Sequence, residues 1–278
     1  MSETRKNIVW LASYPKSGNT WVRIFLANYL LNRSEPIPIN EVHRVGIGDA
    51  IAKTYRMVAR RPIDVTDPDT TLALRPDVLN AIVRNGADVN LVKTHNRRDT
   101  ARGIDLIPPA LTRLGIYILR DPRDVVLSYA RHYAMTPAAT VAAFARDDHA
   151  ISGDSETVPQ YLGSWSQHVR RWTRHTAFPV LTLRYEDLKA DPAGPFTKLL
   201  RRIGMPVEPD RLDRAIRFSS FDEVSRQESA GGFVEKSAAS ERFFHSGLSG
   251  GWRDTLDPEL AARIEADHGT VMKRHGYL

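Results

Sequence analysis

The sequence has no cysteine among its 278 residues. This absence excludes disulfide bonds, thiolate metal sites and a cysteine nucleophile. It is also compatible with a reducing cytoplasm, where disulfides are rare. Any chemistry of this chain therefore comes from its hydroxyl, imidazole, carboxylate and cationic side chains.

Long hydrophobic runs are absent as well. The apolar run at 8–12 is far too short for a membrane span or a secretory signal core. No later segment approaches the length of about 18 uninterrupted apolar residues that a membrane helix needs. We therefore expect a soluble, cytoplasmic protein with no membrane-spanning segment.

Blocks of like charge are missing too. The formal net charge is +6 at pH 7, but the lysines and arginines are scattered along the chain. No aromatic residues alternate with them as they do in a nucleic-acid-binding surface, so we expect no nucleic-acid partner. A generally basic surface and the attraction of a small polyanionic cofactor both remain as interpretations of the charge.

Linkers and internal repeats are also absent, so we expect one domain over residues 1–278. Short apolar runs alternate with helical patterns, which favours a mostly parallel sheet covered by helices on both faces. The expected strands are 7–13, 89–94, 114–119 and 179–184. The expected helices are 18–32, 76–86, 123–134, 160–176, 193–204 and 258–274, the last with Asp257 as N-cap and Pro258 at its first position.

Two segments, 33–75 and 135–158, fit this alternation poorly because they are rich in charged residues, proline and glycine. Long insertions in α/β folds often cover the substrate. Disordered surface decoration is the other interpretation, and the sequence leaves both open.

The turn after the first expected strand reads Tyr14-Pro-Lys-Ser-Gly-Asn-Thr-Trp21. Its glycine lets the backbone approach an anion, the helix start offers N–H groups, and Lys16 adds a positive charge. It is not a Walker A motif, in which the lysine follows the second of two glycines; here Lys16 precedes the only glycine, Gly18. The turn therefore predicts a bound phosphate or sulfonate.

The second expected strand ends in Lys93-Thr94-His95. Residues two apart on a strand point to the same face, and a neighbouring ammonium lowers the pKa of an imidazole. A neutral His95 is a candidate general base. A surface histidine, or one satisfied in the core, is the alternative.

The third expected strand runs into Arg120, and Ser128 follows on the next helix. A guanidinium and a hydroxyl suit a phosphate. The alternative is a local pair of Arg120 with Asp121 or Asp124, the latter capping the helix.

The fourth expected strand ends at Tyr185. Its ring or hydroxyl can contact a ligand, and the alternative is a half-buried tyrosine that only packs.

Two further features concern glycine and histidine. The stretch Gly247-Leu-Ser-Gly-Gly-Trp252 is dense in glycine and suits an anion held by backbone amides.

The nine histidines show no metal-binding spacing, so we expect no metal ion. His168 and His175 lie seven apart on the helix expected at 160–176, a spacing that more often indicates a solvated face.

Taken in this order, the motifs resemble the PAPS-dependent sulfotransferases, specifically the cytosolic type with bacterial relatives; PAPS is 3′-phosphoadenosine 5′-phosphosulfate. The resemblance runs from about residue 7 to residue 253, includes Gly163-Ser-Trp-Ser-Gln-His-Val169, and is weakest over 33–88. It implies a nucleotide-binding transferase with a P-loop-like, three-layer α/β/α fold around a central, mostly parallel sheet. The implied reaction moves a sulfonate group from PAPS to a hydroxyl or amine of a small molecule and leaves 3′,5′-bisphosphoadenosine (PAP).

The resemblance also implies roles for single residues. His95 is the general base with Lys93 beside it, and Lys16 contacts the oxygen that bridges phosphate and sulfate. Fixed cations stabilise the leaving oxygen, so no metal is implied. The other residues implied in PAPS binding are Ser17, Gly18, Asn19 and Thr20 at the 5′-phosphosulfate, Trp21 and Phe221 on the faces of the adenine, Tyr185 at its edge, Ser219 along the nucleotide, Arg120 and Ser128 at the 3′-phosphate, and His245, Ser246 and Gly247 in the C-terminal loop.

The chain departs from the family pattern in three places. Asn19 stands where threonine is usual, and its amide can still bond an oxyanion. His245 and Ser246 replace two basic residues, so two cations at the 3′-phosphate are missing, with Arg242 and Arg253 as candidate replacements. The dimerisation signature of animal members is absent, which leaves a homodimer open.

Two other classes of protein compete with this hypothesis. A P-loop-type small-molecule kinase needs Mg²⁺ and an acidic residue that holds it, and the order of Lys16 and Gly18 disfavours it. A non-catalytic nucleotide-binding protein has no need of His95 at a strand end. The sequence does not define the acceptor, whose pocket we expect in the segments 33–88 and 135–158.

Overall fold

The computed structural model describes residues 6–278; residues 1–5, which the expected domain includes, lie outside the described range. Contacts within the chain divide it into two units. The first contains the residues up to Tyr14, Ile47–Tyr117 and Phe144–Thr182, and the second contains Pro15–Gly46, Ile118–Ala143 and Leu183–Leu278. The expectation of one domain over residues 1–278 stays a prediction.

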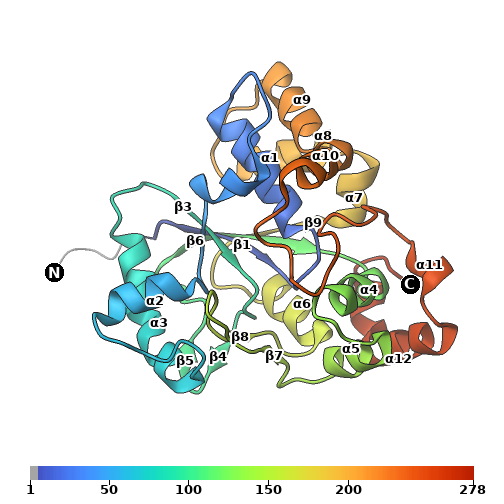
Figure 1. Ribbon diagram of the computed structural model, residues 1–278, viewed down its shortest axis with the longest axis horizontal. Coiled ribbons are helices and arrows are strands. Elements are labelled where there is room, and N and C mark those ends of the chain that lie inside the picture. The colour runs from blue at the N-terminus through green and yellow to red at the C-terminus, as the bar shows by residue number, and fades with distance from the viewer. Residues whose placement is uncertain (1–5) are drawn as a thin grey trace. The chain divides into compact units, whose positions relative to one another are not determined.

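A parallel sheet flanked by helices forms the centre of the fold, which confirms the predicted α/β class (Figure 1). Its strand order is β2-β3-β1-β6-β9. These strands are β1 (Ile8–Ser13), β2 (Ile47–Gly48), β3 (Asn90–Thr94), β6 (Thr112–Leu119) and β9 (Val180–Arg184). In the first unit β1 runs parallel to β3, with Ile8 opposite Asn90 and Ala12 opposite Thr94, and β2 also runs parallel to β3. Every residue of β1 is buried, as expected of a strand that is covered on both faces.

Two helices of the first unit, α2 (Ala52–Ala59) and α3 (Pro68–Val83), pack against each other (Figure 1). The first unit also contains α6 (Trp165–Thr173), the strand pair β4 (Thr100–Ala101) with β5 (Ile104–Asp105), and the strand pair β7 (Ala150–Ile151) with β8 (Gln160–Tyr161). The helix α5 (Pro137–Phe144) belongs to the second unit except for its last residue, Phe144, which is the first residue of a segment of the first unit.

The second unit is mostly helical, and α1 is buried among its helices. The elements are α1 (Asn19–Leu31), the 3₁₀ helix η1 (Ile39–Arg44), α4 (Pro122–His132), α7 (Tyr185–Ala190), α8 (Ala193–Arg202), α9 (Pro209–Phe218), α10 (Phe221–Gly231), α11 (Trp252–Thr255) and α12 (Pro258–Arg274). Ile24 and Ala27 of α1 join a buried cluster with Ile39, Val224 and Phe233. Because α1 is apolar on nearly every side, it packs in the interior of its unit rather than at the surface.

The four predicted strands are present as β1, β3, β6 and β9, and helices occur near each predicted position. The last helix is confirmed in detail: it spans 258–274, Pro258 is its first residue, and Asp257 accepts a hydrogen bond from the Glu259 N–H. The sequence analysis missed β2 and several short helices, among them α7, α9 and α10.

Two predicted helices have wrong boundaries. The helix expected at 76–86 begins at Pro68, where Asp67 caps the first turn, and Pro76 lies inside it. A proline inside a helix removes one hydrogen bond but does not end the helix when packing holds both flanking turns. The helix expected at 160–176 is shorter, because residues 160–161 form β8 and Ser164 caps the first turn of α6.

The segments 33–75 and 135–158 contain regular structure. The first holds η1, β2, α2 and the start of α3, and the second holds α5 and β7. Whether they form the acceptor pocket stays a prediction.

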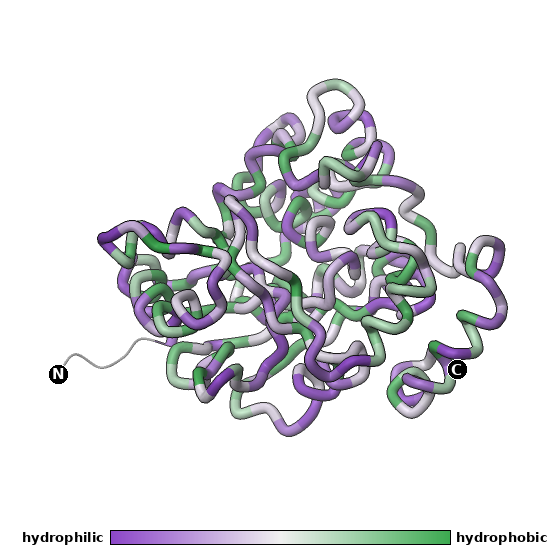
Figure 2. Tube along the Cα trace, turned by 60° about the horizontal axis from the view of Figure 1, so that its bottom comes forward, coloured by the Kyte–Doolittle hydropathy of each residue, from purple (hydrophilic) through white to green (hydrophobic). Residues whose placement is uncertain are grey.

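Hydrophobic residues are spread in short stretches along the chain (Figure 2). Within residues 6–278, no helix is long and apolar enough to cross a membrane.

A buried ion pair holds the edge of the sheet in the first unit. The Arg75 Nη2 atom lies 2.6 Å from Asp49 Oδ2, and both side chains are almost completely buried. Thr94 Oγ1 and Asn96 Nδ2 donate to the same Asp49 oxygen, at 2.8 and 3.1 Å. The residues on either side of His95 are thereby fixed to the ion pair.

Arg75→Met is expected to lower the free energy of unfolding by about 3–5 kcal/mol, because the Asp49 carboxylate stays buried without its counter-charge. Urea denaturation followed by circular dichroism measures the change. Arg146→Met is the matched control: Arg146 also pairs with an aspartate, Asp148, but both side chains are exposed, so stability should hardly change. Equal losses in the two variants would contradict this assignment.

Candidate active site

The turn between β1 and α1 has the backbone of an anion-binding loop. Lys16 has a φ of 68° and Gly18 a φ of 102°, and no side chain of the described residues caps the start of α1. A Cβ atom on Gly18 would lie 2.7 Å from Tyr185 Cδ2, so only glycine fits there. A left-handed lysine costs about 1 kcal/mol or more, and such residues cluster at functional sites. The uncapped N–H groups of the first turn suit a bound anion.

Two polar atoms of the second unit mark a place for a ligand. Ser17 Oγ and Arg120 Nε are buried and have no hydrogen-bond partner among residues 6–278. Buried polar atoms are nearly always hydrogen-bonded in folded proteins. Both residues were predicted to bind phosphate groups, and their unsatisfied atoms fit an anionic ligand.

Lys16 contacts two residues that the sequence analysis did not connect with it. Its Nζ atom lies 3.7 Å from the centroid of the Phe243 ring and 3.5 Å from Nδ1 of His132. The ring attracts the ammonium through a cation–π interaction. The lysine side chain is therefore held between the C-terminal loop and the last turn of α4.

Arg120 joins the turn to the C-terminal loop. Its Nη1 atom donates to the carbonyl oxygen of Lys16 at 3.2 Å, and Nη2 donates to that of Leu248 at 2.9 Å. Its guanidinium carbon lies 4.3 Å from the centroid of the Tyr185 ring. One cation thus orders both segments that were predicted to surround the nucleotide.

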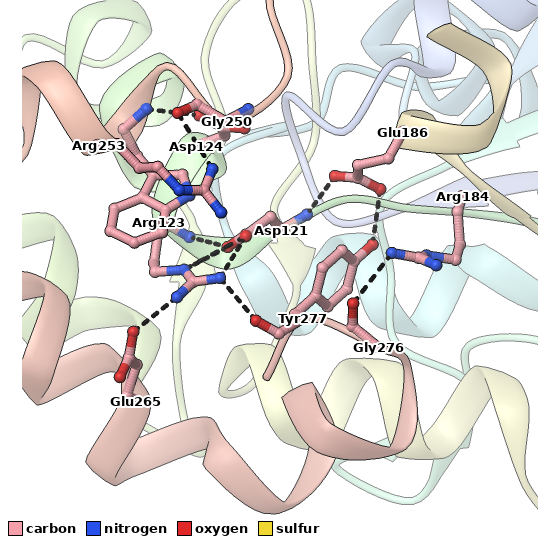
Figure 3. Close-up of polar contacts among 11 residues, drawn as sticks. Asp121, Arg123, Asp124, Arg184, Glu186, Gly250, Arg253, Glu265, Gly276 and Tyr277 are labelled. Carbon is pink, nitrogen blue, oxygen red and sulfur yellow. Dashed lines mark hydrogen bonds and ion pairs between the residues drawn. The ribbon is translucent and has the colours of Figure 1, made fainter. Parts of the chain in front are cut away.

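The alternative that Arg120 pairs with Asp121 or Asp124 is wrong, because each carboxylate is engaged elsewhere (Figure 3). Asp121, not Asp124, caps α4, and it pairs with Arg123 at 2.7 Å. Asp124 accepts hydrogen bonds from the N–H groups of Gly250 and Trp252, at 2.7 and 3.0 Å. Asp124 therefore fixes the C-terminal loop.

The C-terminus closes the same network (Figure 3). Arg123 pairs with Glu265 at 2.6 Å and donates to the carbonyl oxygen of Tyr277 at 2.8 Å. Glu186 accepts from the Asp121 N–H and from the Tyr277 hydroxyl, both at 3.0 Å. These contacts hold the start of α4, next to Arg120, in a fixed position.

Aromatic rings surround the predicted adenine position. The Trp21 ring packs edge-on against Tyr185, with centroids 5.6 Å apart. The Tyr185 hydroxyl donates to the Gly247 carbonyl at 3.2 Å, and a Cβ on Gly247 would lie 2.3 Å from Phe221 Cδ2. The structure thus brings Tyr185, Phe221 and Gly247 together. The sandwich of adenine by Trp21 and Phe221 stays a prediction.

The remaining predicted nucleotide contacts differ in their surroundings. Ser128 is half-buried on α4, whereas His245 and Ser246 are exposed in the C-terminal loop. The hydroxyl of Ser219 is buried and donates to the carbonyls of Ala215 and Ile216. Ser219 therefore has its hydroxyl engaged within its own helix, and its predicted contact with the nucleotide is untested.

Sequence reasoning missed an ion pair beside the turn. Arg23 donates to both carboxylate oxygens of Glu235, at 2.8 and 2.6 Å, and to Asn19 Oδ1 at 3.1 Å. The Thr20 hydroxyl also donates to Glu235, at 3.3 Å. Because these residues lie more than 200 positions apart in the chain, no local pattern could have revealed the pair.

A second arginine lies near Arg120. Partial burial, followed by the positive charge of Arg120, lowers the pKa of Arg131. Arg131 lies one turn of α4 beyond Ser128, on the same face of the helix. Arg120 and Arg131 are thus two cations whose charges interact, although neither of the two basic residues usual in the C-terminal loop is present.

His95 belongs to the first unit, directly after β3. Its Nδ1 atom lies 2.8 Å from the carbonyl oxygen of Ser13 and 3.3 Å from Ser13 Oγ. Because a carbonyl oxygen can only accept, Nδ1 carries the hydrogen. In the neutral form of the ring the lone pair therefore lies on Nε2, the form a general base requires. Lys93 lies half-buried in β3, and its carbonyl accepts from the Asp49 N–H at 3.1 Å.

The expectation that His168 lies on a solvated face is wrong, because its side chain is completely buried. Trp165, His168, Val169 and Trp172 recur at helical spacing and form the buried stripe of α6. That spacing could have revealed its burial, whereas His175 lies beyond the end of the helix. Burial lowers the pKa of His168 to about 3.

Within residues 6–278, no three or more histidine, aspartate or glutamate side chains lie together in a way that could hold a metal ion. The expectation of no metal ion stays a prediction.

Known proteins match the chain over nearly its whole length. A family model described as "Sulfotransferase domain" matches residues 6–276. The chain therefore belongs to the sulfotransferase family and is an enzyme of that class.

Individual relatives agree with the family match. Sulfotransferase 1A1 of the dog (Canis lupus familiaris) is 24% identical over 287 residues, which covers 96% of this chain and 83% of that protein. Sulfotransferase 1A1 of Rattus norvegicus is 26% identical over 284 residues, which covers 94% of this chain and 83% of that protein.

Solved structures show the same fold at lower identity. Retinol dehydratase in complex with androsterone and the inactive cofactor PAP has a TM-score of 0.66 at 18% identity, covering 97% of this chain and 81% of that one. Mouse sulfotransferase SULT7A1 complexed with PAP has a TM-score of 0.63 at 20% identity, covering 97% of this chain and 85% of that one.

The buried His168 is expected to make the protein less stable below neutral pH. The unfolded chain binds a proton at His168 near pH 6.5, whereas the folded chain does so only near pH 3. Stability is therefore fully present above pH 6.5 and falls by up to about 1.4 kcal/mol per pH unit below it. Urea denaturation between pH 7 and 5 measures this loss. His168→Gln should reduce it by about 2 kcal/mol, and an identical pH dependence in both proteins would refute the assignment.

Proposed function

We propose that this enzyme uses PAPS as the sulfonate donor and a hydroxyl or amine of a small molecule as the acceptor. The observation that carries the proposal is the turn at 14–21, where Lys16 is left-handed. Among residues 6–278, no side chain caps the helix that follows, and the buried hydroxyl of Ser17 has no hydrogen-bond partner. The turn offers several N–H groups and one cation to an anionic group. Two solved relatives hold PAP, the desulfated form of PAPS.

Residues of the second unit would hold the nucleotide. The turn Lys16–Thr20 takes the 5′-phosphosulfate, and Trp21, Tyr185 and Phe221 take the adenine. Gly247 keeps the backbone close to Tyr185 and Phe221, since no larger residue fits there. His245 and Ser246 complete the C-terminal loop, and Ser219 lies further along the nucleotide.

Arg120, Ser128 and Arg131 would hold the 3′-phosphate. The buried Nε–H of Arg120 has no partner within the described range, and a phosphate oxygen would supply one. The charge of Arg131 replaces part of what His245 and Ser246 do not provide. Two neighbouring guanidinium groups repel each other, and a bound dianion relieves that repulsion.

In the chemical step, His95 Nε2 accepts the proton of the acceptor hydroxyl. The acceptor oxygen forms a bond to sulfur while the bond from sulfur to the phosphate oxygen breaks. Lys16 stabilises the negative charge that grows on the leaving oxygen, and Lys93 adds a second cation. The proton on His95 balances the reaction, which leaves PAP and a sulfated product.

The proposal includes a cytoplasmic location, as in the cytosolic type of the family.

Transfer of labelled sulfonate from PAPS to a panel of phenols, alcohols and amines tests the function. We expect transfer by the wild type and a loss on the order of 10²- to 10⁴-fold in His95→Ala, with unchanged affinity for PAP. His95→Gln, which retains hydrogen-bonding capacity without a base, should be equally inactive. Near-full transfer by His95→Ala would disprove the assignment of the general base.

Thermal-shift measurements separate the competing classes of function. Selective stabilisation by PAP supports the proposal. Stabilisation by ATP with Mg²⁺ in preference to PAP would indicate a kinase, and stabilisation by single-stranded DNA would indicate a nucleic-acid-binding protein.

Arg131→Gln is expected to weaken PAP binding about ten-fold or more, because one charge at the 3′-phosphate is lost. Binding of adenosine 5′-phosphosulfate, which has no 3′-phosphate, should stay unchanged in isothermal titration calorimetry. Arg201→Gln is the matched control, since Arg201 is an exposed arginine of the same unit in the last turn of α8. Equal losses for both nucleotides would remove Arg131 from the 3′-phosphate site.

A further inference from the structure

The backbone that carries His95 is held by the buried face of α6. His168 Nε2 lies 3.1 Å from the carbonyl oxygen of His95, and Trp172 Nε1 donates to the carbonyl oxygen of Asn96 at 3.1 Å. His168 and Trp172 are both completely buried. Two consecutive carbonyl groups are thereby fixed directly after β3.

The hydrogen positions on His168 follow from its two partners. The His95 carbonyl can only accept, so His168 Nε2 carries the hydrogen. A neutral imidazole has one N–H, so Nδ1 of His168 accepts, and it does so from the Tyr117 hydroxyl at 2.9 Å. Tyr117 thus selects the tautomer of His168 that can donate to His95.

We propose that Tyr117 and His168 are positioning residues for the general base, His95. This inference rests on the proposed function, in which His95 takes the acceptor proton. The chain of hydrogen bonds runs from the Tyr117 hydroxyl through His168 to the carbonyl of His95. At the other end of the residue, the ring is held by Nδ1–H donation to the Ser13 carbonyl at 2.8 Å. With its backbone and ring both anchored, His95 presents Nε2 in a single orientation.

A second structural feature supports a positioning role over simple core packing. An apolar side chain would fill the buried site on α6 without the cost of removing an imidazole from water. The polar pair is fully satisfied, and each hydrogen bond has only one possible direction. A histidine in this place orients a backbone carbonyl, which leucine or phenylalanine cannot do.

The tautomer of His95 is the first measurement. Long-range ¹H–¹⁵N spectra of the ¹⁵N-histidine-labelled protein, assigned with His95→Gln, should show Nδ1 protonated and Nε2 unprotonated in the wild type. Tyr117→Phe removes only the hydroxyl and should give a second population for His95. A spectrum of His95 that is unchanged in both Tyr117→Phe and His168→Leu would overturn the inference, and this reading does not depend on activity.

The rate of transfer is the second measurement. Tyr117→Phe and His168→Leu should lower kcat by about 10- to 100-fold, because a base displaced by a fraction of an ångström transfers protons poorly. The affinity for PAP should stay the same. His168→Gln, whose amide can donate to the same carbonyl, should recover most of the rate.

Tyr29→Phe is the matched control, since it also removes one buried tyrosine hydroxyl, which donates to the Pro206 carbonyl. It should leave kcat unchanged while lowering stability. If Tyr117→Phe and His168→Leu lose only stability, as the control does, the positioning role is wrong. If the wild type transfers no sulfonate, the proposed function fails instead, and the spectra of His95 still decide the inference.

Discussion

The second unit depends on the hydrogen bonds that Arg120 makes with two distant segments. One guanidinium binds the carbonyl oxygens of Lys16 and Leu248 and lies over the ring of Tyr185. The turn after β1 and the C-terminal loop are thereby fixed by the same cation. Its Nε–H has no hydrogen-bond partner in the described part of the chain, so the group that orders this unit also has a donor to offer to a ligand. Under the proposed function, this one side chain combines a structural role with ligand binding.

Two carboxylates near this site bind backbone N–H groups of the C-terminal segment. Asp124 binds the N–H groups of Gly250 and Trp252, and Glu228 binds those of Phe243 and Phe244. A carboxylate that accepts two N–H groups holds a loop without the need for regular structure. The cations Arg120 and Lys16 are then left to interact with carbonyls, rings and an incoming anion. This division of roles suits a site for a polyanion.

Two histidines of the first unit, His95 and His168, differ in how far their side chains are buried. His95 lies half-buried at the end of β3, whereas His168 is completely buried and stays neutral because burial lowers its pKa. In the proposed reaction His95 gains a proton, whereas His168 stays neutral and donates a hydrogen bond. Their positions in the fold, not their chemistry, assign these roles.

Much of the fold was predictable because its signals are local. Apolar runs defined β1, β3, β6 and β9, and Asp257 with Pro258 defined the start of α12. The predicted start of α3 was wrong because the helix continues through Pro76. The predicted start of α6 was wrong because residues 160–161 form β8 and Ser164 caps the first turn. The turn after β1 was recognisable as well, since Lys16 and Gly18 lie two positions apart in the chain, and its binding of an anion stays a prediction.

The sequence by itself determined the class of enzyme, the strands and the residue types of the candidate site, because these depend on neighbours a few positions apart. Only the tertiary structure decided which partners those residues have. It joined Arg120 to Leu248, Arg23 to Glu235 and His168 to His95. Such contacts arise from burial and from hydrogen bonds between segments far apart in the chain, and no periodicity or motif records them.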